Sequence, residues 1–208
     1  MNRAGTVAGL ALAGTCFAVI GLVLSRRLRV NLRVRYADGR YLVAVRYPGE
    51  WHEIREFIQP DNPDVIACYS QIGPNVWSCL DFVCRNISFR KDIGEFWQLS
   101  SETLTKKEGD CEDSAILLTS LLKNFTNAYV VLGNLQGWGH AWAASEEGEI
   151  LETTYTRATI VPDPENYCPY VYFSDQEVIE MWPGALREVF ELRHNEATKL
   201  SLMAAALT

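Results

Sequence analysis

Residues 109–122 read GDCEDSAILLTSLL, in which a cysteine lies among acidic residues and an apolar run follows. Acidic residues favour the first turn of a helix, because they oppose the positive end of its dipole. The apolar run after Ser114 is too continuous for a helix that has one face in water. The stretch therefore predicts a central helix that is packed on most sides and has Cys111 in its first turn.

Cys111 is predicted to lie where a thiol can act as a nucleophile. Unpaired backbone N–H groups and the positive dipole at a helix start favour the thiolate form of a cysteine. His140, on a strand predicted after this helix, can share the thiol proton. Glu152 is predicted on the partner strand, where an odd-length loop would place it on the same face as His140 and an even-length loop would point the two apart. We therefore predict a site made of Cys111, His140 and Glu152.

Strands and helices are expected on both sides of the central helix. After it, strands are predicted at residues 128–132, 139–144 and 149–155, the last two joined as an antiparallel hairpin across Ser145-Glu146-Glu147-Gly148. Before it, residues 28–36 and 41–47 predict another hairpin, with its turn at Ala37-Asp38-Gly39-Arg40. A linker is expected at 59–64, and helices are expected at 74–86 and 185–206. This mixture indicates an α+β fold.

The length and charge of the chain limit its function. With 208 residues it has room for one globular domain, and its 48% hydrophobic residues can bury a core. Eight arginines against Asp38 and Glu50 give residues 1–50 a charge of +6, and 11 basic against 24 acidic residues give the remainder −13. An acidic body argues against nucleic-acid binding.

The six cysteines do not follow a metal-binding pattern. Neither a CxxC motif nor a pairing of cysteine with histidine has the spacing of a zinc site. We expect most of them to be small buried side chains. They are Cys16, Cys68, Cys79, Cys84, Cys111 and Cys168.

The N-terminal residues predict a membrane anchor. Residues 4–25 are 22 residues without a charge, enough at about 1.5 Å per residue to cross a hydrocarbon layer of ~30 Å. A cleaved signal peptide is the alternative, although its apolar part should span only about 7 to 15 residues. The arginines that follow the span favour a cytoplasmic location for the rest of the chain. They also fit an alternating strand, so the sequence does not decide on which side of the membrane the rest of the chain lies. We expect a single-pass anchor at 1–27, a hairpin and linker at 28–60, and a catalytic domain at 61–208.

The predicted site lies in motifs that resemble a known family. These motifs are Trp97-Gln98, Glu102-Thr103-Leu104, Gly109-Asp110-Cys111-Glu112-Asp113, Tyr129-Val130-Val131-Leu132-Gly133, His140-Ala141-Trp142 and Leu151-Glu152-Thr153-Thr154-Tyr155. Together they resemble the transglutaminase-like superfamily, and most closely its prokaryotic cysteine proteases, over about residues 64–175. The resemblance does not include residues 1–60 or the last helix.

The resemblance implies a papain-like α+β core and acyl transfer through a thioester. It makes Cys111 the nucleophile, His140 the general base and then acid, and Glu152 the acid that orients the imidazole. Many members carry Asp where Glu152 stands, and the longer side chain constrains the hydrogen bond less. The backbone N–H of Cys111 and a second donor would hold the oxyanion. Gln98 and Trp97 are the candidates for that donor, because they lie in the segment that leads to the nucleophile.

The resemblance also implies that the protein can bind calcium, although the implied chemistry requires no cofactor. Some calcium-dependent bacterial members use the acids beside the nucleophile as ligands, and Asp110, Glu112 and Asp113 match that pattern. Carboxylate oxygens suit Ca²⁺. The helix dipole explains acids at these positions as well.

Three functions are compatible with these residues. A thioester resolved by water makes the protein a peptidase, and one resolved by an amine makes it a transglutaminase. We favour a peptidase acting on a protein or peptide, because the chain shows no sign of the extra domains common in cross-linking enzymes and a membrane tether suits cleavage of a nearby protein. The third alternative is a binding module that has the fold but no catalytic turnover. The presence of competent residues at all three triad positions argues against it.

Overall fold

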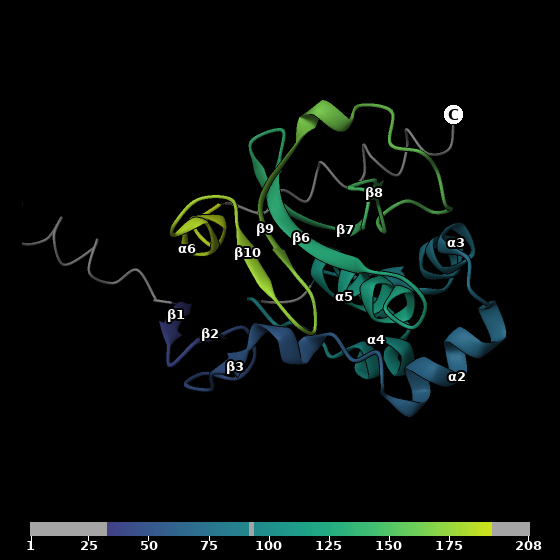
Figure 1. Ribbon diagram of the computed structural model, residues 1–208, viewed down its shortest axis with the longest axis horizontal. Coiled ribbons are helices and arrows are strands. Elements are labelled where there is room, and N and C mark those ends of the chain that lie inside the picture. Colours follow the sequence, from purple (N-terminus) through teal and green to yellow (C-terminus); the bar gives the residue numbers. More distant parts are fainter. Residues whose placement is uncertain (1–32, 92–93, 193–208) are drawn as a thin grey trace, which may run out of the picture. The chain divides into compact units, whose positions relative to one another are not determined.

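The computed structural model of the protein describes residues 33–91 and 94–192, in which a five-stranded antiparallel sheet curves beside a buried helix (Figure 1). The order of the strands is β10-β9-β6-β7-β8. Their bounds are Ala128–Leu135 for β6, Trp138–Ser145 for β7, Ile150–Leu151 for β8, Tyr167–Phe173 for β9 and Val178–Glu180 for β10. Strands β6 and β7 pair along their whole length, which places Gly133 opposite His140.

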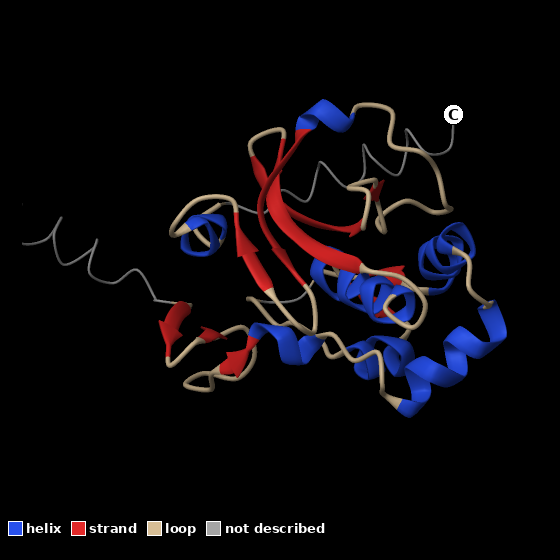
Figure 2. Ribbon diagram, in the orientation of Figure 1, coloured by secondary structure: helices blue, strands red, loops and turns tan. Residues whose placement is uncertain are grey.

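Helix α5, Cys111–Leu122, is the predicted central helix, and the structure confirms it. Each of its residues is buried. It packs against β6 and β7 and also against three other helices, which Figure 2 shows grouped beside the sheet. These are α2 (Pro63–Ile72), α3 (Val76–Asn86) and α4 (Ser100–Lys106). The apolar run of α5 is continuous because the helix has neighbours on most of its sides.

A three-stranded antiparallel sheet precedes these helices and is formed by β1 (Val34–Ala37), β2 (Arg40–Val43) and β3 (His52–Glu53). It confirms the predicted first hairpin, although the second strand, predicted at 41–47, ends at Val43. Asp38 and Gly39 have φ values of 51° and 73°, as a tight two-residue hairpin turn requires. Val43 lies in one buried cluster with Ala115 and Ile116 of α5. The hairpin and the central helix therefore share a core.

Short elements carry the chain into the site. Strands β4 (Ser88–Phe89) and β5 (Glu108–Gly109) pair in parallel, and β5 ends two residues before Cys111. The 3-10 helices are η1 (Ile54–Phe57) and η2 (Pro164–Asn166), of which η2 leads directly into β9. Helix α6 (Ala185–Val189) packs against β9 and β6.

The structure corrects several expectations about these elements. Helices α2 and α4 and strands β9 and β10 are not among the predicted elements, and the strand predicted at 149–155 is reduced to β8. The helix predicted at 185–206 is α6, which ends at Val189, and the part of that prediction beyond residue 192 lies outside the described residues. The anchor predicted at 4–25 lies outside them too. Within residues 33–91 and 94–192, each helix is too short or too polar to cross a bilayer.

Candidate active site

His140 and Glu152 meet across the hairpin of β7 and β8, which confirms the predicted pairing of these strands. Ala144 pairs with Ile150, so the connection between the paired positions has an odd number of residues. This register places Glu152 diagonally across from His140 on the same face. His140 Nε2 lies 2.8 Å from Glu152 Oε2.

The Glu152 carboxylate is fully buried and surrounded by donors. Besides facing His140, Oε2 accepts a hydrogen bond from the Tyr167 hydroxyl at 2.9 Å, and Oε1 accepts one from the backbone N–H of Thr154 at 2.8 Å. Burial raises the pKa of a carboxyl, but the attraction of His140 and the hydrogen bonds from His140 and Thr154 outweigh it and hold the pKa of Glu152 at about 2. Glu152 is therefore ionised, and its Oε2 is placed to accept a hydrogen bond from His140 Nε2.

Tyr167 is a site residue that the sequence motifs do not include. It is the first residue of β9, fifteen positions after Glu152, and reaches the carboxylate because β9 pairs with β6. Its ring meets Trp142 edge-on, with centroids 5.1 Å apart, and the Trp142 ring lies alongside that of His140 at 6.1 Å. The aromatic content of residues 167–173 was the one sequence signal for this strand.

Cys111 is the first residue of α5, as the sequence predicts. The residue is 9% exposed, and its thiol donates a hydrogen bond to Glu112 Oε2 at 2.9 Å. Glu112 and His140 line the same narrow cleft. The start of α5 and the imidazole on β7 therefore face a common space.

The end of α6 closes this cleft with apolar side chains. Val189 and Phe190 line it together with Leu132 and Trp97. The rings of Phe190 and Trp97 stack with centroids 5.7 Å apart and planes 21° from parallel. A substrate that approaches His140 therefore meets the C-terminal end of α6.

Two acids give the cleft its electrostatic character. Glu112 is 4% exposed, and Glu95 lines the cleft beside it. Burial and the negative charge of Glu95 raise the pKa of Glu112 to about 7. Glu95 is itself held by an ion pair with Arg33 at 2.8 Å.

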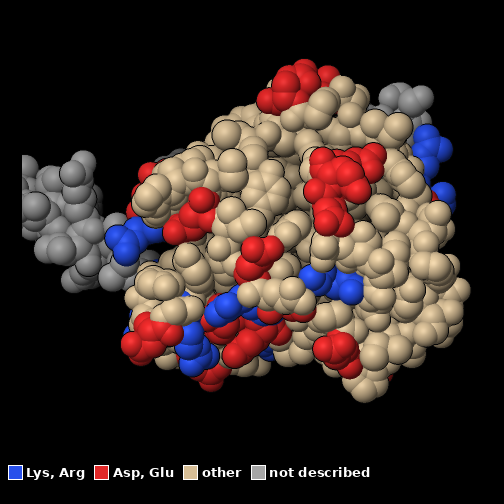
Figure 3. All heavy atoms as spheres, in the orientation of Figure 1, with Lys and Arg blue, Asp and Glu red and all other residues tan. Residues whose placement is uncertain are grey.

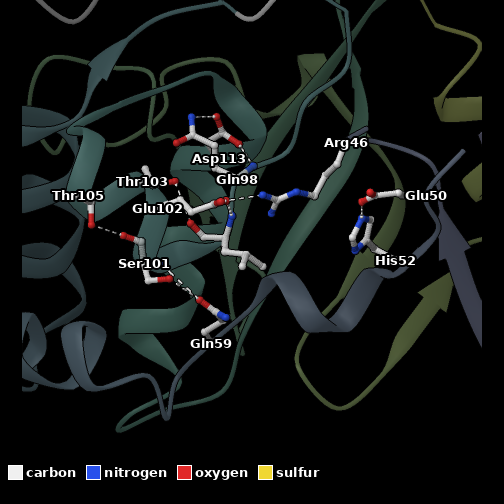
Figure 4. A network of polar contacts seen from close by, with 11 residues as sticks. Arg46, Glu50, His52, Gln59, Gln98, Ser101, Glu102, Thr103, Thr105 and Asp113 are labelled. Atoms are coloured by element: carbon white, nitrogen blue, oxygen red, sulfur yellow. Dashed lines mark hydrogen bonds and ion pairs between the residues drawn. The ribbon is translucent and has the colours of Figure 1, made fainter. Parts of the chain in front are cut away.

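Gln98 and Asp113 form a buried network next to the start of α5 (Figure 4). Asp113 accepts the Gln98 backbone N–H at 2.7 Å and the Gln98 side-chain amide at 2.6 Å. The amide also donates to the carbonyl oxygen of Glu108 at 3.1 Å. Both amide hydrogens are therefore used within the protein, and Gln98 does not fit the predicted oxyanion role. It braces the turn that leads into α5.

Trp97, the other predicted oxyanion donor, is engaged as well. Its indole N–H donates to Glu95 at 3.2 Å. Its ring is 2% exposed and packs against Phe57, Phe173 and Phe190. Trp97 therefore forms part of the wall of the cleft. Among the predicted oxyanion donors, the backbone N–H of Cys111 is the one that lies at a helix start.

Two of the predicted calcium ligands accept hydrogen bonds from groups of the protein. Asp113 is directed toward Gln98, and Glu112 accepts the thiol hydrogen of Cys111. Burial and the charge of Asp110 raise the pKa of Asp113 to about 7, which reflects a poorly solvated carboxyl. In the described part of the chain, no three His, Cys, Asp or Glu side chains are grouped to hold a metal. The calcium site at Asp110, Glu112 and Asp113 therefore stays a prediction.

Comparisons with known proteins bear on the same segment. Residues 95–166 match the family model described as the CEP76 peptidase-like domain. Among solved structures, EGTA-treated LapG from Legionella pneumophila has a TM-score of 0.48 and 14% identity, covering 74% of this chain and 93% of that one. Its calcium-bound form has a TM-score of 0.45 and 15% identity, covering 69% of this chain and 86% of that one.

A third solved structure is that of a candidate cysteine protease from Cytophaga hutchinsonii. It has a TM-score of 0.47 and 18% identity and covers 60% of this chain. The chain spans about half the length of that protein, 48%. A search of the curated proteins finds no match.

The family model includes the three predicted site residues, Cys111, His140 and Glu152. It begins just before Trp97 and ends just before Tyr167. The helix start, the hairpin and the buried acid described above all lie within it. Through this segment the chain is recognised as similar to the transglutaminase-like superfamily, in agreement with its sequence motifs.

Proposed function

We propose that the protein is a thiol-dependent acyl-transfer enzyme, and more narrowly a cysteine peptidase that cleaves an amide bond through a thioester on Cys111. The observation that carries the proposal is the pair of His140 and fully buried Glu152, 2.8 Å apart. A buried carboxylate is costly unless it is paired, and here its partner is an imidazole at the cleft. An imidazole oriented in this way is suited to exchange a proton with a nucleophile.

The proposed steps follow from the atoms of the site. Because His140 Nε2 faces Glu152, Nδ1 is the ring nitrogen that accepts the thiol proton. Cys111 Sγ adds to the amide carbon, and the backbone N–H at the start of α5 stabilises the negative oxygen. The C–N bond breaks as His140 gives its proton to the leaving amine, which leaves a thioester. His140 then deprotonates a water molecule that adds to the thioester carbon. The C–S bond breaks, the carboxylic acid leaves, and His140 returns the proton to Cys111 Sγ.

The reactivity of Cys111 as a function of pH tests the proposal. Alkylation is followed on the Cys111 peptide by mass spectrometry, because Cys168 is exposed and reacts as well. An activated thiol titrates roughly between 3.5 and 7.5, against ~8.5 for a free one. We expect Cys111 to react well below pH 7 and to lose this reactivity in His140→Ala and Glu152→Ala. His52→Ala is the matched control, because His52 lines a different pocket.

Two results would change the assignment. An ordinary thiol profile for Cys111 in the unmodified protein would contradict the enzyme and favour a binding module on the same fold. If Cys111 is activated, an unfolded protein substrate is offered together with a primary-amine probe. Cleavage supports a peptidase, whereas incorporation of the amine without cleavage makes the protein a transglutaminase.

We further propose a protein or peptide substrate near a membrane that the chain reaches through residues 4–25. On the face drawn in Figure 3, lysines and arginines lie scattered among acidic side chains and form no continuous basic surface. This distribution supports the expectation that nucleic acid is not the partner. Recovery of the full chain in carbonate-washed membranes supports the anchor, and recovery in the soluble fraction contradicts it. Protease protection in sealed vesicles would identify the side of the membrane.

The proposed chemistry takes place without a metal. Asp113 accepts hydrogen bonds from Gln98, and Glu112 accepts one from the Cys111 thiol, so both carboxylates have partners within the protein. We expect the alkylation profile of Cys111 to be the same in EGTA and in millimolar Ca²⁺. Loss of reactivity in EGTA that added calcium restores would show that these acids rearrange into a site.

A further inference from the structure

We propose that Tyr167 is a positioning residue of this site, whose hydroxyl holds the Glu152 carboxylate in the orientation that faces His140. The inference rests on the proposed function and adds a fourth side chain to it. Tyr167 acts through Glu152 and has no role in the proton transfers themselves.

The hydrogen bonds of Glu152 carry the inference. The Tyr167 hydroxyl donates to Oε2 at 2.9 Å, and this is the oxygen that lies 2.8 Å from His140 Nε2. Oε1 is held separately by the backbone N–H of Thr154. Because glutamate has one more rotatable bond than aspartate, its carboxylate needs more anchors to keep one orientation. The hydroxyl of Tyr167 supplies such an anchor at Oε2, the oxygen that faces His140 Nε2.

Tyr167 is itself held in place by its surroundings. The residue is 7% exposed and pairs with Leu135 where β9 runs beside β6. The pairing of these two strands shifts register between Leu132 and Gly133, and the Tyr167 ring lies edge-on to Trp142 beyond this shift. Packing of the ring on this sheet therefore fixes the position of its hydroxyl oxygen beside Glu152.

The electrostatics agree with a role as a permanent donor. Burial and the negative charge of Glu152 raise the pKa of Tyr167 well above its ordinary range. The hydroxyl therefore keeps its proton around neutral pH, where it donates to the ionised carboxylate.

The variant Tyr167→Phe tests the proposal, because it keeps the ring and removes the hydroxyl. We expect Cys111 alkylation below pH 7 to slow roughly tenfold, in proportion to one hydrogen bond to a charged group. We also expect the acid limb of the profile to move to higher pH, since a less ordered imidazole stabilises the thiolate less. Tyr129→Phe is the matched control, because the Tyr129 hydroxyl donates to Glu177 at 2.8 Å on the exposed side of the same sheet. It should leave the profile unchanged.

A double-mutant cycle separates positioning from packing. If Tyr167 acts through Glu152, then Tyr167→Phe has no further effect on the acid limb in a Glu152→Gln background. Additive effects of the two changes would overturn the proposal. So would an unchanged profile for Tyr167→Phe beside an activated Cys111 in the unmodified protein. An ordinary thiol in the unmodified protein instead contradicts the proposed function itself, so the two failures are distinguishable.

Discussion

Gly133 occupies a point on β6 where neighbouring segments leave no room for a side chain. A Cβ atom there would overlap the carbonyl oxygen of Cys168 and lie 2.6 Å from Cη2 of Trp142. Cys168 follows Tyr167 on β9, and the Trp142 ring lies beside His140. A glycine is therefore needed at this position to bring β9 and β7 close enough for Tyr167 to reach Glu152.

We expect Gly133→Ala to lower the free energy of unfolding by about 1–3 kcal/mol, the usual cost of overpacking. We also expect it to slow Cys111 alkylation, because it displaces Tyr167 or Trp142. Urea unfolding and the alkylation assay measure the two effects. The control is Gly137→Ala, since a Cβ at Gly137 meets nothing within 4 Å and only its φ of +93° makes it costly. Equal alkylation rates in both variants would show that the close approach at Gly133 does not support the site.

The residues of the site differ in how far the sequence predicts them. His140 and Glu152 belong to one hairpin, so the parity of a short loop decides whether they share a face. The sequence left that parity open, and the register of β7 and β8 shows the odd alternative. Tyr167 comes from a strand that pairs with β6 across a long stretch of chain, and local patterns do not report such pairings. Gln98 was predicted as an oxyanion donor from its position before the nucleophile, but its buried amide is used to hold Asp113.

Helix α6 ends at the cleft of the proposed site. Val189 and Phe190 at its end line the cleft with His140, and Phe190 stacks on Trp97. We expect Phe190→Ala to increase several-fold the rate at which a bulky maleimide modifies Cys111. A small reagent such as iodoacetamide should gain little, since it needs less space. The readout is the ratio of the two rates, measured on the Cys111 peptide.

A matched control for this change exists on the other side of the core. Phe125 stacks on Tyr69 with the same centroid distance of 5.7 Å. Phe125→Ala therefore removes an equivalent aromatic contact without opening the cleft. An equal rise of the rate ratio in both variants would mean that general loosening, and not α6, controls access.

Among the elements, those with a repeating apolar pattern were predicted and those defined by other signals were not. Helix α5 follows from its continuous apolar run. The linker predicted at 59–64 overlaps the start of α2. Pro63 follows the cap Asn62 and occupies the first turn of the helix, where proline is well tolerated. Strand β9 contains Pro169, which weakens a strand prediction, although it lies where the pairing with β6 shifts register.

For the molecule as a whole, three buried carboxyls have the large pKa shifts among the described acids. The pKa of Glu152 is lowered to about 2, and those of Glu112 and Asp113 are raised to about 7. A carboxyl whose pKa is lowered by folding stabilises the fold at pH values above its ordinary pKa near ~4. This stabilisation is lost as the pH falls toward about 2. A raised pKa has the opposite sign, so protonation of Glu112 and Asp113 stabilises the fold as the pH falls from about 7 toward about 4.

The two signs together predict that the free energy of unfolding is largest between about pH 4 and pH 5, on the acid side of neutrality. Urea unfolding from pH 2.5 to pH 8 measures this. Glu112→Gln should flatten the slope between about pH 5 and pH 7, since its amide stays neutral, and Glu152→Gln should flatten the slope below about pH 4. The exposed acid Glu147 offers a control in Glu147→Gln, which should change neither slope. A maximum at or above pH 7 would mean that Glu112 and Asp113 are ionised without cost, and that the cleft is more open to water than its buried acids indicate.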